Sequence, residues 1–561
     1  MLTTQPTEST YQIACSLIKA SLIGLLLLPS LAPAEPANPE LGPVALGRRI
    51  YRENIGSNDQ PVTAKAQGDV PIQGPQFACV NCHKRSGLGA SEGTKTAPPI
   101  TREFLFQARE RTRKELYASS AGASGVRPAY TEATLRKAIL GGVDANGRNL
   151  DPLMPRYVLS PQETDALVAY LKSLSHSTAP GVGETEIHFA TVIAGNVPPN
   201  SVSAMQGVIG AFIDDKNSGT RLEERRANNG PWQMENMNKA YRKWVLHTWT
   251  LQGEPNTWPE QLRSEYAKQP VFALIGGIGQ GTWQPVHDFC QSSEVPCIFP
   301  SIEQTPQADE SFYSLYFSKG LRLETEALAK YLRETNPTTP IIQVVRPDAP
   351  SSVAAAESFG AVWSKKSGVV PLSTEKLPLD PRGHEKFWAA LQKQPGKTWV
   401  LWLDSKDLGG MGKNKSAEPE RIIITASLFT DGAPKFPANL AAHTEILSSL
   451  ALPQQQSASL IRMRAWARNK KLVLKYPKIE ADVYFAVIMA NTALLHNLTY
   501  FSREYFIETI EHKLDQMPFK ALYPKLTLGP NQRYASKGCY IVPLSQFNTP
   551  EAAKLAKWIV P

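Results

Sequence analysis

Two cysteines and a histidine form the stretch of this chain best suited to chemistry, Cys79-Val80-Asn81-Cys82-His83. A Cys-x-x-Cys-His run is typical of sites where a c-type haem is attached covalently. Each sulfur adds to one vinyl group of the porphyrin, and the turn of backbone between the thiols lets both reach their targets. The histidine then lies under the iron as its proximal ligand. The run therefore predicts one haem c, anchored by Cys79 and Cys82 and ligated by His83.

Two other kinds of site use a pair of cysteines at this spacing. A zinc site of this kind needs further ligands, commonly a second Cys-x-x-Cys, and the sequence has none. A thiol–disulfide redox pair does not require a histidine directly after Cys82, nor the methionine described next. The sequence therefore favours haem over both alternatives.

One methionine, Met154, lies between the haem motif and residue 205, and it follows His83 by 71 positions (154 minus 83). A thioether sulfur is a soft ligand that favours ferrous iron and raises the reduction potential, so Met154 is predicted as the second axial ligand. A gap-filling core methionine is the other interpretation. Iron closed on both sides transfers electrons, whereas a haem enzyme such as a peroxidase needs an open position. The site therefore predicts an electron carrier without catalytic residues.

Length and composition bound the class of protein. The chain has 561 residues, too many for one core, which predicts two or three domains. With 42% hydrophobic and 20% charged residues, it is typical of a globular protein in water. The net charge of +9 is not concentrated, since the densest basic run, 109–114, also contains Glu110. We interpret that run as a solvated helix face rather than a nucleic-acid site, although it would also steer an acidic redox partner.

The first residues predict export to the periplasm. Lys19 precedes the apolar run Leu22–Leu28, and Ala32-Pro33-Ala34 supplies the cleavage signal of a signal peptide, 1–34, cut near Ala34. The apolar run is too short to span a membrane, and no later stretch is long and apolar enough. Export also agrees with the haem motif, because c-type haem is attached outside the bacterial cytoplasm.

Three cysteines remain once the leader and the haem motif are set aside: Cys290, Cys297 and Cys539. In an oxidising compartment Cys290 and Cys297 would form a short disulfide, which leaves Cys539 unpaired. Two separately buried thiols are the alternative, and spacing alone does not decide between them.

Periodicity predicts a first folded unit, an all-α domain over 35–178. The polar stretch 56–77, which contains glycine and proline, is expected to be a loop that leads into the haem motif. The expected helices are 43–54, 102–117, 132–140 and a last one opened by the capping box Ser160-Pro161-Gln162-Glu163.

This unit resembles the class I cytochromes c, and more closely the small c-type domains that accept electrons from periplasmic dehydrogenases. The resemblance implies that the Gly47/Tyr51 helix crosses the Leu171 helix and that a carbonyl near Pro98 orients His83. It also implies a periplasmic redox partner, for which a quinoprotein dehydrogenase is the expected donor. The stretches that carry it are Cys79–His83, Ala97-Pro98-Pro99, Gly141-Gly142-Val143-Asp144 and Leu153-Met154-Pro155-Arg156-Tyr157.

A linker, 179–185, consists of small, polar and chain-breaking residues. From 186 to 561 strands and helices alternate, which predicts parallel sheets with helices on both faces. This length exceeds one sheet, so we expect an α/β domain of two lobes. The expected strands are 187–193, 271–277, 295–300, 340–345, 399–403 and 422–426, and the expected helices are 203–216, 232–245, 282–291, 321–334, 351–363 and 482–495.

The second unit resembles the type I periplasmic substrate-binding proteins, the kind that binds branched-chain amino acids. The resemblance rests on Ser203–Gly207, Leu274–Gly277 and Val295–Ser301, and on Gly320-Leu321-Arg322, which opens a helix. In that family the ligand lies between the lobes, held by loops after strands and by helix N-termini. Turns or core packing would explain the same residue types. The cleft residues that the resemblance implies are Gly279, Gln280, Thr282, Trp283, Ser301, Glu303, Trp402 and Ser405.

Together these features predict an exported fusion of a monohaem cytochrome c with a bilobed domain that binds a small molecule or docks the redox partner. Closure of the lobes would then change access to the haem edge. The alternative is an ABC-transporter substrate-binding protein in which the haem is an accessory. A haem enzyme is the third hypothesis, and Met154 disfavours it.

Overall fold

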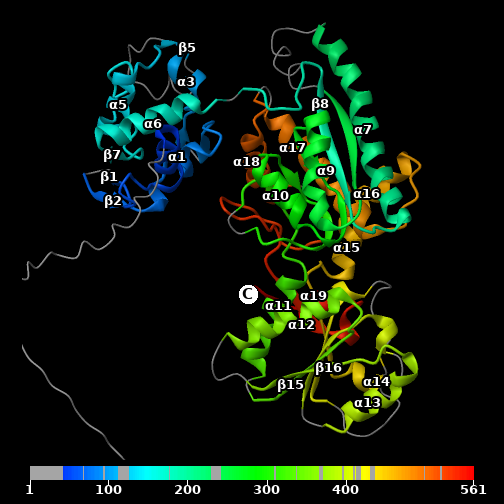
Figure 1. Cartoon of the computed structure of the whole chain (residues 1–561). Helices are drawn as coiled ribbons and strands as arrows, with labels where there is room; N and C mark the ends of the chain where they lie inside the picture. Colours follow the sequence, from blue (N-terminus) through cyan, green and yellow to red (C-terminus); the bar gives the residue numbers. More distant parts are fainter. Residues whose placement is uncertain are drawn as a thin grey trace, which may run out of the picture. The chain divides into compact units, whose positions relative to one another are not determined.

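The computed structural model describes residues 42–561 apart from 67–68, 93–94, 111–125, 176, 229–241, 309–310, 337, 366–369, 395–396, 409–410, 412–418, 430–435, 437, 498–499 and 518–520. By its internal contacts the chain divides into Met1–Gly42 and Pro43–Pro561 (Figure 1). The predicted signal peptide and most of the basic run 109–114 lie outside the described residues.

The haem-motif region contains helices and also short strands, so the expectation of an all-α domain is wrong. Strands β2, β1 and β7 form a three-stranded antiparallel sheet, and β1 lies inside the stretch expected to be a loop. The helices are α1 (Pro43–Glu53), α2 (Cys79–His83), α3 (Arg102–Phe106), α5 (Glu132–Gly141) and α6 (Pro161–Ser173). The strands are β1 (Thr63–Lys65), β2 (Pro71–Gln73), β3 (Ala90–Glu92), β4 (Lys95–Ala97), β5 (Arg109–Glu110), β6 (Val126–Arg127) and β7 (Arg156–Val158).

Helices α1 and α6 cross at Gly47, which confirms the crossing expected from the sequence. A β-carbon on Gly47 would lie 2.0 Å from the backbone oxygen of Ala166 and 2.7 Å from the β-carbon of Tyr170, so only glycine lets the helices approach this closely. One turn further on, the rings of Tyr51 and Tyr170 pack with their centroids 5.2 Å apart.

Capping residues begin two helices where the sequence predicted. The Thr131 side chain accepts a hydrogen bond from the backbone N–H of Thr134 at the start of α5. At α6 the Ser160 hydroxyl accepts from the N–H of Glu163, whose carboxylate accepts from the N–H of Ser160 in return. The expected starts of both helices are confirmed.

Helix α3 is shorter than the expected 102–117. It ends at Phe106, and Arg109–Glu110 is already a strand. The Arg127 guanidinium donates hydrogen bonds to the backbone oxygens of Phe104 and Gln107, which are carbonyls that a continuing helix would use. A residue remote in sequence therefore stabilises the end of this helix.

The first large sheet is entirely parallel. Its order is β13-β11-β8-β10-β12-β14, and β9 also pairs with β8. The strands are β8 (Glu186–Ala194), β9 (Lys243–Leu251), β10 (Ala273–Ile275), β11 (Ile278–Thr282), β12 (Cys297–Ile298), β13 (Ser301–Gln304) and β14 (Ser314–Leu315). The helices around it are α7 (Pro199–Asn228), α9 (Trp258–Lys268), α10 (Gln284–Ser292), α17 (Pro477–Asn497) and α18 (Arg503–Lys513).

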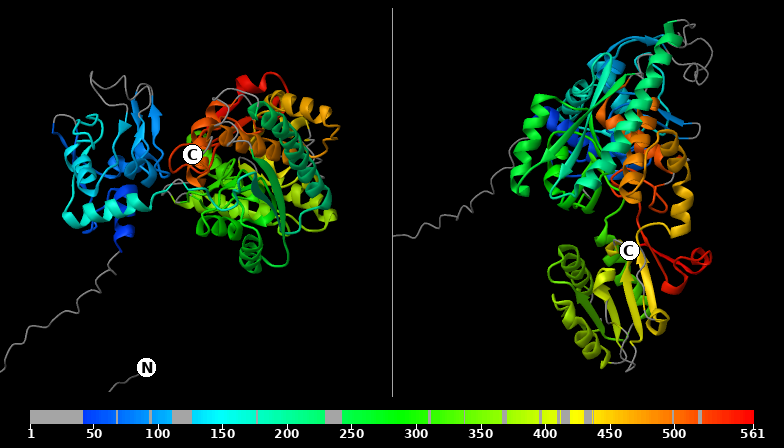
Figure 2. Two further views of the ribbon diagram at one scale, coloured as in Figure 1. Left: turned by 90° about the horizontal axis from the view of Figure 1, so that it is seen from above. Right: turned by 90° about the vertical axis from the view of Figure 1, so that its right-hand side faces the viewer.

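Alternate residues of β8 face opposite sides of this sheet, and both sides are buried. Phe189 and Ile193 pack in one core with residues of α7, α17 and α18, whereas Ala190 and Val192 pack in another with residues of α9 and α10. The prediction of a parallel sheet between two helical layers is therefore confirmed (Figure 2).

The expected helix 232–245 is wrong over its described end. Lys243–Val245 opens β9, and 229–241 lie outside the described residues. The segment 243–251 is rich in aromatic and β-branched residues, and each of its residues pairs with one of β8. Pairing along a buried neighbour outweighs the local helical spacing.

The second large sheet has five parallel strands and two antiparallel ones, in the order β16-β15-β17-β18-β19-β20-β21. The strands are β15 (Ile341–Val345), β16 (Leu372–Lys376), β17 (Thr398–Trp402), β18 (Arg421–Thr425), β19 (Thr444–Ser448), β20 (Cys539–Pro543) and β21 (Lys557–Ile559). The helices are α11 (Leu321–Thr335), α12 (Pro350–Ser364), α13 (His384–Gln392), α14 (Ala438–Ala441) and α19 (Ala552–Leu555).

The chain passes between the two sheets three times, at 315–321, 448–453 and 535–539. After β19 ends at Ser448, the helices α15 (Pro453–Ser459), α16 (Ile461–Asn469), α17 and α18 follow before the chain re-enters the second sheet at Cys539. The crossings therefore meet the edge where β19 ends and β20 begins. Because β15 to β19 are parallel, their carboxyl ends all lie at this crossing edge.

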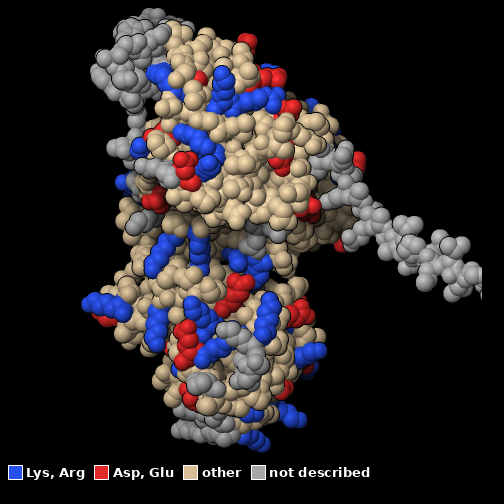
Figure 3. Space-filling view, turned by 90° about the vertical axis from the view of Figure 1, so that its left-hand side faces the viewer, with Lys and Arg blue, Asp and Glu red and all other residues tan. Residues whose placement is uncertain are grey.

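On the face drawn in Figure 3, charge is spread as the sequence predicts. Figure 3 shows Lys and Arg side chains interspersed with Asp and Glu on one face, without a large area of one sign. Among the described residues, no helix has the length and hydropathy needed to cross a membrane.

Replacing Gly47 with alanine tests the helix crossing. Gly47→Ala forces a methyl group against the Ala166 carbonyl and should lower the free energy of unfolding by about 1–3 kcal/mol. Gly141→Ala is the matched control, because nothing lies within 4 Å of its added carbon, and it should be neutral or stabilising by up to about 1 kcal/mol. Urea unfolding followed by haem absorbance measures both, and equal stabilities would contradict the close crossing.

Candidate functional site

The haem motif forms the single helical turn α2. Positions three apart lie on the same side of a helix, so the thiols of Cys79 and Cys82 share one face of the turn. Cys82 is exposed, whereas Cys79 is half-buried. Burial raises the pKa of Cys79 to about 11, and a contact with the Tyr157 hydroxyl opposes the rise. The spacing therefore presents two thiols together.

The imidazole of His83 is buried and oriented. Its Nδ1 lies 2.9 Å from the carbonyl oxygen of Pro98, so Nδ1 carries the proton and donates it, and Nε2 keeps a free lone pair. Burial lowers the pKa of His83 below its usual value, with the Pro98 contact opposing the shift, and this favours the neutral ring that can bind a metal. The expectation that a carbonyl near Pro98 orients His83 is confirmed.

The loop that carries Met154 is tied to the haem motif by the three-stranded sheet. Ala64 of β1 pairs with Tyr157 of β7, only three residues after Met154. The Tyr157 hydroxyl donates a hydrogen bond of 2.6 Å to the carbonyl of Phe77, just before the motif. The Met154 N–H donates to the Asp151 carbonyl at 3.0 Å, which closes the loop into a turn.

These residues fit a haem c. The turn presents two thiols, the neutral imidazole has one nitrogen held and one free, and a thioether lies in a loop fastened beside the motif. Residues Cys79, Cys82 and His83 would hold the group, and Met154 remains the predicted second axial ligand.

Sequence analysis missed the residues that fasten this loop. Tyr157 and strand β1 connect Met154 to the haem motif, yet β1 has only three residues and its partner lies more than ninety positions away. The one signal was the alternation of Val62 and Ala64, both buried, with polar neighbours.

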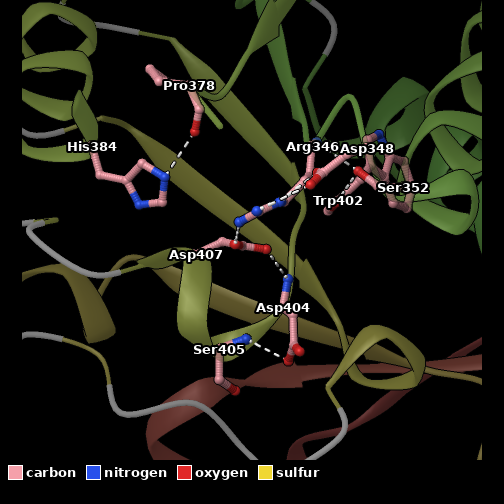
Figure 4. Close-up of polar contacts among 9 residues, drawn as sticks. All are labelled: Arg346, Asp348, Ser352, Pro378, His384, Trp402, Asp404, Ser405 and Asp407. Carbon is pink, nitrogen blue, oxygen red and sulfur yellow. Dashed lines mark hydrogen bonds and ion pairs between the residues drawn. The ribbon is translucent and has the colours of Figure 1, made fainter. Parts of the chain in front are cut away.

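At the crossing edge of the second sheet, Arg346 joins the ends of two strands (Figure 4). Directly after β15, its guanidinium pairs with Asp407, in the turn that follows β17, and with Asp348 at 2.7 Å. Asp407 is 2% exposed and also accepts from the N–H of Asp404 at 3.2 Å. The charges are mutually satisfied, so this network holds the edge together.

Of the two cleft residues predicted on this sheet, Ser405 lies at its edge and Trp402 lies in the core. Ser405 lies at the crossing edge, and its hydroxyl is buried without a hydrogen-bond partner (Figure 4). Trp402 is 0% exposed, and its indole N–H donates to the Gln343 side chain at 3.0 Å. Trp402 therefore fills the core, whereas Ser405 is half-buried and keeps an unused hydroxyl.

The cleft residues predicted on the first sheet gather on two paired strands. Gly279, Gln280 and Thr282 lie on β11, and Glu303 lies exposed on β13, which pairs with β11 in parallel. Trp283 is 1% exposed and packs directly under Gly279, where a β-carbon would lie 2.7 Å from its ring. Trp283 thus supports these strands from inside.

Ser301, the remaining predicted residue, belongs to a buried polar cluster that sequence reasoning did not find. Its hydroxyl donates a hydrogen bond of 2.8 Å to Asp482, which also pairs with Lys478 at 2.8 Å. Burial raises the pKa of Asp482, and Lys478 opposes the rise. Asp482 Oδ1 has no hydrogen-bond partner, whereas the Lys478 side chain is 45% exposed. The cluster therefore has an unused acceptor beside a cation that solvent reaches.

Cys290 and Cys297 are free thiols in the structure, which is the alternative to the short disulfide expected in an oxidising compartment. Cys290 and Cys297 are both completely buried. Burial raises the pKa of Cys290, and the neighbouring Cys297 raises it further. Burial on adjacent elements explains both cysteines without a covalent bond, and Cys539 is buried as well.

A carboxyl group is buried without a cation at the crossing edge. Glu324 of α11 is 0% exposed and accepts hydrogen bonds from the Ser427 hydroxyl at 2.5 Å and the Ser449 N–H at 3.1 Å. Burial raises its pKa to about 7, although both hydrogen bonds oppose the shift.

One family model matches part of the chain. Residues 74–175 match the family model described as Cytochrome c, so this part of the chain is a cytochrome c domain and implies a haem cofactor. No match to a curated protein was found.

Solved structures are similar in fold to the α/β part of the chain, 186–561. A possible leucine/isoleucine/valine-binding protein from Rhodopirellula baltica is 15% identical, covering 68% of this chain and 98% of its own, with a TM-score of 0.42. A branched-chain amino-acid ABC transporter protein from Thermus thermophilus with bound valine is 12% identical, covering 64% and 94%, with a TM-score of 0.45. A solute-binding protein from Rhodopseudomonas palustris, in complex with 3,4-dihydroxybenzoic acid, is 11% identical, covering 64% and 93%, with a TM-score of 0.42. The two parallel sheets of 186–561 are defined by their own strand pairing.

The raised pKa of Glu324 predicts a pH-dependent stability. The folded state favours the protonated form more than the unfolded state does, so stability should fall as pH rises from about 4.5 through about 7, by up to about 3 kcal/mol. Glu324→Gln keeps an oxygen that accepts from the Ser449 N–H, and its amide nitrogen can donate to the Ser427 oxygen, so it should remove this loss. Urea unfolding at pH 5 and pH 8 measures it, with Glu326→Gln on the same helix as the matched control. Parallel pH profiles for the two variants would contradict the assignment.

Proposed function

We propose that this protein is a periplasmic electron carrier, a cytochrome c with one covalently attached haem joined to a domain that binds a small molecule. The redox part of the proposal rests on the His83 ring, which follows two thiols on one helical turn. The Pro98 carbonyl holds this ring through its Nδ1. Export follows from this proposal, because covalent haem attachment takes place outside the cytoplasm.

Each residue of the site has a role in that proposal. Bound haem would supply a one-electron couple at its iron. Cys79 and Cys82 would anchor the porphyrin, and His83, through Nε2, and Met154 would ligate its iron. The Pro98 hydrogen bond fixes the ring orientation and makes Nε2 a better donor. Because Met154 leaves no open position, we propose a carrier rather than an enzyme.

The redox partner is proposed from the resemblance to domains that accept electrons from periplasmic dehydrogenases, with a quinoprotein dehydrogenase as the donor. The second unit either binds a ligand that modulates this exchange or docks the partner. The alternative function, a transport binding protein with an accessory haem, predicts tight ligand binding that is the same in both redox states.

Substitution of Met154 tests the predicted ligand. Met154→Ala should abolish the long-wavelength absorption band that marks thioether ligation of ferric haem and should lower the reduction potential, because a soft ligand that favours ferrous iron is lost. Leu153→Ala is the matched control, since Leu153 is 62% exposed one position away, and it should leave both unchanged. Visible spectra and redox titration of the purified protein decide, and a band that persists in Met154→Ala would exclude this ligand.

The ligand-binding half of the proposal rests on the unused Asp482 oxygen beside Ser301 and Lys478. An acceptor left unpaired in a buried site costs free energy, and a ligand carrying a hydrogen-bond donor would recover it. Lys478 would hold an anionic group of the same molecule. The proposal is therefore a small polar ligand with a donor and an acidic group.

Mass spectrometry of the small molecules released on denaturation should identify this ligand. With the identified ligand, Ser301→Ala should weaken binding by about tenfold, because Asp482 loses the hydrogen bond that positions it. Ser311→Ala is the control, since its hydroxyl bonds only the nearby Ala308 carbonyl, and it should bind normally. Equal affinities for the two variants would place the ligand elsewhere.

A further inference from the structure

A cavity of about 270 Å³ lies beside α1 and α6, apart from the haem motif and from the crossing edge of the second sheet. Three arginines, Arg48, Arg52 and Arg85, line it together with Tyr170 and one carboxylate, Glu504. Cys79, Cys82, His83 and Met154 do not line it, so it is not the haem site.

Two local features bring the three arginines together. Arg48 and Arg52 are four residues apart on α1 and therefore lie on the same side of that helix. Arg85 follows the haem-binding turn by two residues, and its guanidinium lies 4.3 Å from the ring centroid of Phe312. Stacking on a ring face leaves the in-plane N–H groups of a guanidinium available to other partners.

The positive charge of the cavity is not neutralised by the described residues. Within that part of the chain, no carboxylate lies at ion-pair distance from Arg48, Arg52 or Arg85. The Nε atoms of Arg52 and Arg85 are buried and have no hydrogen-bond partner. Arg49, one position along α1, differs, because it pairs with Asp59 and Glu53.

The one carboxylate at the cavity is already engaged. Glu504 Oε1 accepts a hydrogen bond of 2.6 Å from the Tyr313 hydroxyl, and Oε2 accepts one of 2.9 Å from the Ser502 hydroxyl. Three positive groups therefore face one carboxylate whose two oxygens each have a donor from elsewhere.

Bringing like charges together in a partly buried space has an electrostatic cost. Arg48, Arg52 and Arg85 line one cavity, so their positive charges repel one another there. Unpaired buried donors add a second cost. Both costs fall when an anion enters the cavity and accepts hydrogen bonds from the guanidinium groups.

We propose that this cavity is a binding site for a small multivalent oxyanion, of the phosphate or dicarboxylate class, held by Arg48, Arg52 and Arg85. The planar donor fork of arginine matches the paired oxygens of such anions. The three arginines belong to the redox half of the chain, whereas Glu504, which also lines the cavity, and Phe312, on which Arg85 stacks, belong to 186–561.

The test is a calorimetric titration of the full-length, haem-loaded protein with inorganic phosphate at low ionic strength. One phosphate should bind per chain, and Arg52→Gln should weaken binding at least about tenfold, since it removes a charge-assisted hydrogen bond. Arg49→Gln is the matched control, because it removes the same charge from the same helix outside the cavity, and its affinity should stay within about twofold.

A second variant and a second measurement guard against misfolding. Arg48→Gln is at an exposed position and should weaken phosphate binding in the same direction with an unchanged visible spectrum and unfolding transition. Phosphate that fails to bind the unmodified protein would overturn the site. Equal weakening by Arg49→Gln and Arg52→Gln would also overturn it, because this result reports surface charge alone.

Discussion

The hydrogen bond between His83 Nδ1 and the Pro98 carbonyl decides what the first half of the chain can do. It holds the ring in one orientation and one tautomer, so that the free nitrogen points away from the supporting loop. Without this hydrogen bond, the His83 imidazole on a five-residue helix would be free to rotate. The crossing of α1 with α6 and the three-stranded sheet both keep the surroundings of this bond in place.

The second half is organised by strand direction rather than by a single bond. Because β15 to β19 run the same way, the residues that follow them meet at one edge, and the chain uses the same edge for its passages to the other sheet. Arg346 pairs with Asp407 there, and burial raises the pKa of the Glu324 carboxyl to about 7. Polar residues at this edge are therefore of two kinds, those that satisfy each other and those, such as Ser405, that retain unused hydrogen-bonding capacity.

Local signals in the sequence predicted the features that depend on neighbours in the chain. The haem motif, the Ser160–Glu163 capping box and most of the alternating strands and helices belong to this class, since their geometry is set within a few residues. Features that depend on remote partners could not be predicted. The end of α3 depends on Arg127, the Met154 loop on a three-residue strand, and the orientation of Ser301 on Asp482, 181 positions away. Trp283 and Trp402 were expected to line a cleft, but both are buried in the core. Large aromatic side chains occur in both settings, so the residue type alone did not distinguish them.

The late return of the chain to the second sheet has a consequence for biosynthesis. Strand β20 covers the outer edge of β19, yet the ribosome makes it about ninety residues later, after four helices that belong elsewhere. Until then β19 is an uncovered edge with free backbone donors and acceptors, a surface prone to pairing with other chains. This lobe cannot be completed on a growing chain until β20 has been translated.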